Sequence, residues 1–213
     1  MSNTVIHAHG LMKAFGPTRA LAGIDLSILA GQSVAIMGAS GSGKTTLLHV
    51  LAGITRPDAG QVLFTPSAAV SIEVSALGES ARSRLRRESF GFVFQQGLLM
   101  PELTAVENVA LAAMITGVPR AEATQRAAGW LAALGLQGME DRRIGELSGG
   151  QAQRVAIARA QVTGASVVFA DEPTGALDSE TSSEVMDALL WSTTGQGRPL
   201  VVVTHDPQGA AGC

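Results

Sequence analysis

The fold is decided by one stretch of sequence, Gly38-Ala39-Ser40-Gly41-Ser42-Gly43-Lys44-Thr45. This stretch has the form G-x-x-x-x-G-K-[ST], and it lies between an apolar run at 33–37 and a helical pattern at 46–52. Glycines let the backbone turn without a steric penalty from Cβ, and the N–H groups at the start of a helix attract anions. The stretch therefore predicts a strand, a phosphate-binding loop and a helix.

The last two residues of the loop have defined roles in this motif. Lys44 reaches the β- and γ-phosphates of a bound nucleotide, and the Thr45 hydroxyl binds Mg²⁺. The alternative is a Gly/Ser-rich turn before an ordinary helix. We favour the phosphate loop, because the residue types and their strand and helix context both fit.

The composition narrows the class of protein. The chain has 213 residues, enough for one large α/β domain, and 46% of them are hydrophobic. Its net charge of -3 and pI near 5.8 disfavour a nucleic-acid-binding protein. No apolar run approaches the ~20 residues of a membrane-spanning helix. The single cysteine, Cys213, favours a reducing compartment.

Short strands are expected on both sides of the loop. Residues 5–15 contain a strand-like stretch, and 24–29 alternate apolar and polar residues as a half-buried antiparallel strand does. Phe15 precedes a Gly-Pro turn, where it either stacks on a flat base or packs in the core. Residues 90–94 read as a buried strand that ends at Gln95, in the position where α/β sheets place groups that face a ligand.

Residues from about 96 to 147 change character and predict an inserted helical lobe. The Thr104-x-x-Glu107 pattern is a capping box that opens an apolar helix, and 120–134 predict a second helix. Next comes Leu147-Ser148-Gly149-Gly150-Gln151. Ser148 and Gln151 have the spacing of a capping box, but the two glycines also suggest a second anion site at a helix start.

Acidic residues follow the buried strand at 167–170. Asp171 and Glu172 are costly there unless they are paired or bind a cation, so we expect Asp171 to hold Mg²⁺ and Glu172 to act as general base. Asp178 is equally consistent with a helix N-cap. The last strand, 200–203, precedes His205, which is placed to contact a γ-phosphate or to orient water.

In this order, these elements resemble the nucleotide-binding subunit of an ABC transporter over essentially the whole chain. The resemblance implies an α/β P-loop NTPase fold with a mixed core sheet, an antiparallel β subdomain and an inserted helical subdomain. The chain would form one ATP-binding domain, with a core at 1–95 and 148–213 and the helical subdomain at about 96–147. Three segments, 91–95, 99–109 and 170–179, are similar to the macrolide-export, lipoprotein-release and antimicrobial-peptide transporter type.

The resemblance also assigns roles to individual residues. It implies catalytic roles for Glu172, His205, Lys44 and Gln95, and Mg²⁺ contacts from Thr45, Gln95 and Asp171. ATP contacts are implied for Phe15, Gly38, Ala39, Ser40, Gly41, Ser42, Gly43, Lys44, Thr45, Thr46, Ser148, Gly149, Gly150, Gln151 and Asp178. In this family two subunits pack head to tail, so the segment 148–151 would close over the partner's ATP.

The expected partners are a second copy or a paralogous subunit, together with a membrane permease that places the chain at the cytoplasmic face of the membrane. The leading interpretation is an ATPase that drives export or extraction of a lipophilic or peptide-like compound. A module that signals through a membrane protein without carrying cargo is the alternative, because the motifs are the same. A soluble ATPase of DNA repair or translation fits less well.

Overall fold

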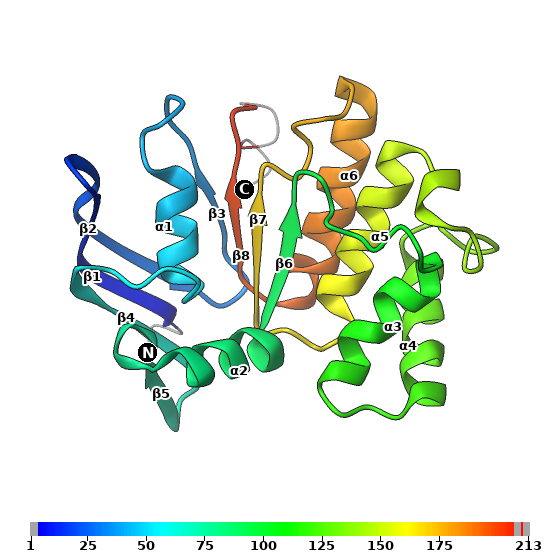
Figure 1. The fold of residues 1–213 in the computed structure, drawn as a ribbon, viewed down its shortest axis with the longest axis horizontal. Coiled ribbons are helices and arrows are strands. Elements are labelled where there is room, and N and C mark those ends of the chain that lie inside the picture. Colours follow the sequence, from blue (N-terminus) through cyan, green and yellow to red (C-terminus); the bar gives the residue numbers. More distant parts are fainter. Residues whose placement is uncertain (1–3, 207–209, 211–213) are drawn as a thin grey trace.

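Two sheets organise the chain in the computed structural model, which describes residues 4–206 and 210 (Figure 1). The first sheet is antiparallel, in the order β2 (Thr18–Leu29), β1 (Thr4–Phe15), β4 (Ala59–Ser67) and β5 (Val70–Glu73). The second sheet is parallel, in the order β3 (Ser33–Ile36), β8 (Leu200–Val203), β7 (Val167–Asp171) and β6 (Phe90–Phe94). The fold is mixed because one sheet is antiparallel and the other is parallel. Within the core sheet, all four strands run parallel. Cys213 lies outside the described residues.

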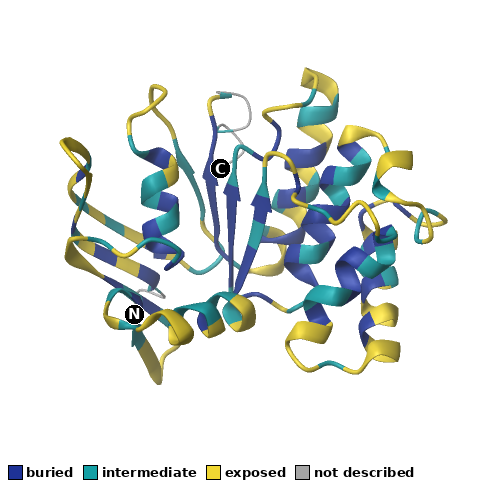
Figure 2. Cartoon of the chain, viewed as in Figure 1, coloured by how far each residue is buried: buried dark blue, intermediate teal, exposed yellow. Residues whose placement is uncertain are grey.

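Helices cover both faces of the parallel sheet. Because side chains alternate along a strand, Val167, Phe169, Val201 and Val203 pack with α1 (Lys44–Leu51) on one face. On the other face, residues 168, 170, 200 and 202 pack with α5 (Gly149–Gln161) and α6 (Ser179–Ser192). Of the two central strands, β8 is buried along its whole length and β7 is buried except at Asp171, which is half-buried (Figure 2). The phosphate loop and the segment 147–151 therefore belong to different layers of one chain.

The remaining helices lie outside these layers. α2 (Glu79–Ser89) leads into β6, whereas α3 (Ala105–Ile115) and α4 (Arg120–Ala133) form the helical lobe against α5 (Figure 1). The capping box predicted at Thr104 is confirmed: Oγ1 accepts the Glu107 N–H at 3.3 Å, and the Glu107 carboxylate accepts the Thr104 N–H at 3.0 Å. Short 3₁₀ turns occupy Val74–Ala76, Ile144–Glu146 and Thr194–Gln196.

Among the described residues, no helix combines the length and the apolar character that crossing a bilayer requires.

Candidate functional site

The loop at residues 37–43 connects β3 to α1 at the carboxyl end of the parallel sheet (Figure 1). Gly41 and Gly43 have φ angles of 76° and 92°, which L-residues rarely adopt. A methyl group built on Gly43 would also clash with the carbonyl oxygen of Ala20. The loop is closed by a 3.2 Å hydrogen bond from the Ser42 N–H to the Ala39 carbonyl, and Ser40 is exposed within it. The sequence therefore needs glycine at this point for shape as well as for conformational freedom.

We expect Gly43→Ala to destabilise the chain by about 2 kcal/mol or more, because it combines backbone strain with a clash. Thermal or urea unfolding measures this loss. Gly138 has a φ of 82°, but a methyl group added there would meet no heavy atom within 4 Å, so Gly138→Ala is the matched control that isolates the backbone strain. An equal loss in the two variants would contradict the role of the Ala20 contact.

Lys44 bends back across the loop. Its Nζ donates hydrogen bonds of 2.9 Å to the carbonyl oxygens of both Gly38 and Ala39, and the residue is buried. The ammonium group is thus fixed against the backbone of the loop, and Thr46 follows in the first turn of α1. A cation fixed against a glycine-rich loop at the start of a helix is suited to bind a polyphosphate.

The metal-binding residues predicted from the sequence meet at the end of β7. The Thr45 Oγ1 donates a 3.1 Å hydrogen bond to Oδ1 of Asp171, although 126 residues separate them. Burial raises the pKa of Asp171, and the hydrogen bond from Thr45 and the charges of His49 and Lys44 lower it in part. A carboxylate whose ionised form is disfavoured by burial gains from a cation beside it. The hydroxyl and the carboxylate are hard oxygen ligands of the kind Mg²⁺ prefers.

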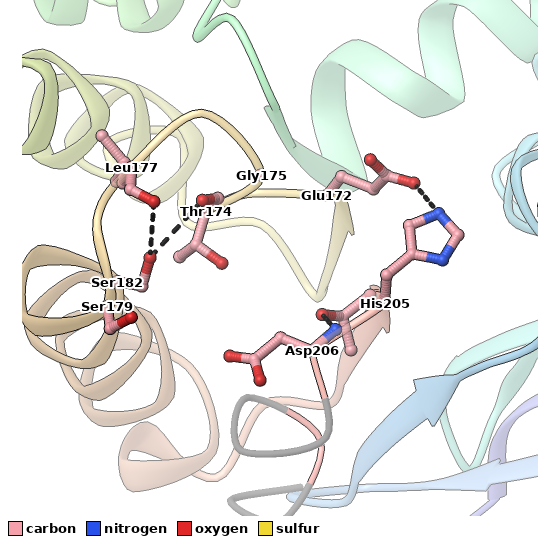
Figure 3. Close-up of a pocket in the computed structure, with 9 residues that line it drawn as sticks. Glu172, Thr174, Gly175, Leu177, Ser179, Ser182, His205 and Asp206 are labelled. Atoms are coloured by element: carbon pink, nitrogen blue, oxygen red, sulfur yellow. Dashed lines mark hydrogen bonds and ion pairs between the residues drawn. The ribbon is translucent and has the colours of Figure 1, made fainter.

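Glu172 and His205 are in contact at the neighbouring strand ends, and they form an ion pair when the histidine is protonated (Figure 3). His205 Nε2 lies 2.6 Å from Oε1 of Glu172, and the Glu172 N–H donates to the Val203 carbonyl at 2.9 Å. Glu172 has a φ of 48°, in the left-handed region where a non-glycine residue is strained. Such strain persists where the surroundings fix it, and here the carboxylate of the strained residue contacts the histidine. The two residues line a cavity of about 650 Å³.

Gln95 follows β6 and lies at a second cavity, of about 350 Å³. Thr45, Asp171 and Glu172 line the same cavity, so the structure brings Gln95 together with the predicted metal and base residues. Phe15 lies apart from them at the end of β1, and the residue is 54% exposed. An exposed ring is available for stacking, which disfavours the alternative that Phe15 is a core residue.

The segment 148–151 is occupied within its own chain by a capping box. Ser148 Oγ accepts the Gln151 N–H at 3.2 Å, and Gln151 Oε1 accepts the Ser148 N–H at 2.9 Å. The segment therefore caps its own helix. Ser148 and Gly149 are also exposed, so an anion can reach the start of the helix. Gly150 is buried, and a methyl group there would clash with the side chain of Thr181 on α6. The glycine thus also serves helix packing.

Asp178 caps α6 in this structure. Its Oδ1 accepts the Thr181 N–H at 3.0 Å and its Oδ2 accepts the Thr181 hydroxyl at 2.8 Å. The backbone hydrogen bond from Thr181 lowers the pKa of Asp178 and favours its ionised form. The predicted N-cap is confirmed, and a nucleotide contact from Asp178 stays a prediction.

Sequence reasoning missed the charged pair beside Phe15. Lys13 Nζ lies 2.7 Å from Oδ1 of Asp58 and 5.5 Å from the centre of the Phe15 ring. The Asp58 Oδ2 also accepts the Ala14 N–H at 2.7 Å, so the pair fixes the end of β1. No local pattern signals this contact, because 45 residues separate Lys13 from Asp58.

Comparison with known proteins identifies relatives of the whole chain. The family described as "ABC transporter" matches residues 21–175. The chain is 46% identical over 216 aligned residues to the pyoverdine export ATP-binding/permease protein PvdT of Pseudomonas syringae pv. syringae, covering 99% of this chain and 32% of that protein. It is 49% identical over 190 residues to the macrolide export ATP-binding/permease protein MacB of Marinobacter nauticus, covering 89% of this chain and 29% of that protein. The chain thus spans about a third of the length of the curated relatives it matches.

Solved structures agree with the fold. A dimeric structure of MJ0796, a bacterial ABC transporter cassette, superposes with a TM-score of 0.84 at 36% identity, covering 97% of this chain and 90% of that one. A second dimeric structure of MJ0796, in a post-hydrolysis state with ADP and Pi bound, gives a TM-score of 0.83. The predicted α/β fold of the ABC-ATPase type is therefore confirmed.

Proposed function

The chain belongs to the ABC transporter family of ATP-binding cassettes, and from this premise we propose that it binds and hydrolyses ATP to drive a membrane permease. One observation carries the proposal. At the carboxyl ends of adjacent parallel strands, the Thr45–Asp171 hydrogen bond and the Glu172–His205 contact lie beside the phosphate loop. Phosphoryl transfer needs positioned charge of this kind more than covalent chemistry.

The nucleotide would lie along the phosphate loop, with its base against Phe15. The backbone N–H groups of the loop and the Nζ of Lys44 would bind the phosphates, and Lys44 would exchange its bonds to the loop carbonyls for phosphate oxygens. Mg²⁺, held by Thr45, Asp171 and Gln95, would neutralise charge on the phosphates. Burial of Asp171 supports this, because an unneutralised carboxylate is disfavoured there.

Glu172 and His205 would manage the attacking water. Glu172 has two carboxylate oxygens, and His205 binds Oε1, which leaves Oε2 to accept a proton from water. The 2.6 Å contact orients the carboxylate, and Glu172 follows the last residue of β7 with a left-handed backbone. His205 in turn could donate to the γ-phosphate after the pair opens.

A second copy or a paralogous chain would complete the site. Ser148 and Gly149 are exposed at the start of α5, and the layer arrangement separates them from this chain's own phosphate loop. A γ-phosphate held between two helix N-termini would favour a head-to-tail dimer, and hydrolysis would weaken it. The dimeric MJ0796 structures are consistent with such an assembly.

The permease would contact the apolar surface near Gln95. Leu98 and Ile115 are 60% and 56% exposed, and Arg159 neighbours both, through a bond to the Leu98 carbonyl and a shared cavity with Ile115. The names of the relatives, macrolide export and pyoverdine export, favour export of a lipophilic or peptide-like compound from the cytoplasmic face of the membrane. Transmission to a membrane protein without cargo is the alternative.

The test is to purify the tagged Glu172→Gln chain with ATP from mildly solubilised membranes of its source cells and to identify its companions. We expect a permease, and we expect Ile115→Asp to reduce its recovery at least about tenfold by placing a charge in an apolar contact. Val70→Asp, at an exposed apolar residue of β5, is the matched control. Recovery of the self-dimer alone, with ATP closure verified, would contradict the membrane-coupled function.

A further inference from the structure

The loop that carries Gln95 is held by a side chain of α5. Arg159 Nη2 donates to the Gly97 carbonyl and Nη1 donates to the Leu98 carbonyl, each at 2.6 Å. The planar guanidinium group presents two parallel donors to two successive carbonyl oxygens, which fixes position and orientation together. Burial lowers the pKa of Arg159, and the two carbonyl oxygens replace water as hydrogen-bond partners of the buried guanidinium.

A second side chain of the same helix holds the other end of the loop. The Gln153 Nε2 donates a 2.9 Å hydrogen bond to the carbonyl of Phe94, the last residue of β6. Gln153 is buried, and it precedes Arg159 by six residues, or roughly 9 Å along the helix axis. Side chains of α5 therefore hydrogen-bond to the backbone just before and just after Gln95.

The gripped loop has a conformation that local sequence does not favour. Leu98 has a φ of 49°, one of only two left-handed non-glycine residues in the described part of the chain. The loop's own hydrogen bonds are short-range, from Gly97 N to Phe94 O at 2.8 Å and from Leu98 N to Gln96 O at 2.7 Å. A strained backbone of this kind persists only when its surroundings determine it. The hydrogen bonds from Arg159 and Gln153 hold the loop in this conformation.

The strand before the loop is also packed closely on α5. A methyl group built on Gly91 of β6 would lie 2.6 Å from the Ala160 carbonyl oxygen, too close to be accommodated without a shift. The strand and the loop that follows it are thus both in close contact with the helix. A displacement of α5 along or across the sheet would carry the loop with it.

We propose that Arg159 and Gln153 are positioning residues that couple the loop of Gln95 to the Ser148 end of α5. The inference rests on the proposed function, in which Gln95 faces this chain's nucleotide and Ser148 faces the partner's. Closure of the partner's site would pull on α5, and the two side chains would transmit that movement to Gln95. Each site in the dimer would then sense whether the other is closed.

The variants Arg159→Met and Gln153→Met test this, because methionine keeps most of the side-chain volume and removes the hydrogen bonds. Arg159→Lys keeps the charge and can bind one carbonyl. Arg126→Met on α4, where the arginine pairs with Glu122 on an exposed surface, is the matched control. Each variant is made in the full chain, and melting temperature reports whether it folds.

The first readout is hydrogen–deuterium exchange of the amides at 96–98, with and without ATP in the Glu172→Gln background that traps the dimer. We expect exchange in the trapped dimer to slow for the unmodified loop. We expect it to stay at least about tenfold faster in Arg159→Met and Gln153→Met, with Arg159→Lys intermediate. The second readout is steady-state ATP hydrolysis, where kcat should fall about tenfold and the KM for ATP should stay within about twofold, since the phosphate loop is untouched.

Slow exchange in the trapped dimers of both Met variants, or an unchanged kcat in them, would overturn the coupling. If Arg159→Met does not fold, Gln153→Met and Arg159→Lys decide the question by the same criteria. Failure of the proposed function has a different signature, the absence of ATP turnover by the unmodified chain. The exchange comparison in the nucleotide-free chain would then still show whether the two side chains hold the loop.

Discussion

Replacing Glu172 by glutamine is expected to leave ATP binding intact, to slow ATP hydrolysis by at least about a hundredfold and to trap an ATP-bound dimer. The substitution is nearly isosteric, so the strained backbone at this residue and the hydrogen bond from its N–H to the Val203 carbonyl should persist. The amide oxygen can still accept the hydrogen bond of His205. It cannot take a proton from water, which is the step the carboxylate performs in the proposed function.

Each expectation has its own measurement. Phosphate release measures hydrolysis, fluorescence measures nucleotide binding, and light scattering measures whether the dimer forms. Glu122→Gln is the matched control, because Glu122 is an exposed residue of α4 that pairs with Arg126. Undiminished phosphate release by Glu172→Gln would show that Glu172 is not the general base. Loss of ATP binding would show instead that the substitution disturbs the phosphate loop.

Local patterns in the sequence were sufficient to predict much of the fold. Phe90–Phe94 and Leu200–Val203 form strands with the predicted bounds, because a short apolar run between polar residues is typical of a buried parallel strand. β2 is longer than predicted, since it begins at Thr18 and the alternation is recognisable only from Ile24. Gly23, with a φ of 89°, and shifts of register against β1 interrupt the pattern there.

The contacts that shape the site are non-local, and a local pattern does not reveal them. The segment that contains Thr45 and the strand that ends at Asp171 could each be predicted, and their meeting followed from parallel strand ends. The left-handed backbone of Glu172 could not be predicted from the sequence, because it is imposed by the surrounding fold and not by the residue type. The contacts of Arg159 could not be predicted either, because its carbonyl partners lie 61 and 62 residues away in the sequence.

Two separate reasons favour glycine at position 150. In the sequence, the glycine suggested a bare backbone that an anion can approach. In the structure, a side chain at this position would also clash with Thr181. The two reasons are compatible, because the side-chain position of Gly150 faces α6, while the neighbouring residues Ser148 and Gly149 are exposed at the helix start. A substitution at Gly150 would therefore confuse packing with binding. Ser148 is the better probe of the anion site.

Ser148→Arg is expected to spare ATP binding by the single chain and to weaken ATP-dependent dimerisation by at least about thirtyfold, the loss typical of an interface hot spot. Ser148 is exposed at the start of α5, so an arginine there has room in the monomer. In the proposed head-to-tail dimer the same position would face the partner's γ-phosphate, where a bulky side chain would hold the two surfaces apart. The background is Glu172→Gln, and light scattering with ATP measures dimer formation against concentration.

Ser148→Ala separates the interface from the helix cap. Both variants lose the hydrogen bond from the Gln151 N–H to Ser148 Oγ, which costs about 1 kcal/mol of helix stability, but only arginine adds bulk. We therefore expect the two variants to melt at similar temperatures and the alanine variant to dimerise far better. Normal dimerisation of Ser148→Arg would remove the head-to-tail arrangement, since no packing of Ser148 against a partner's nucleotide leaves room for the longer side chain. Equal loss in both variants would assign the effect to the cap and leave α5 without a direct contact to the partner's phosphate.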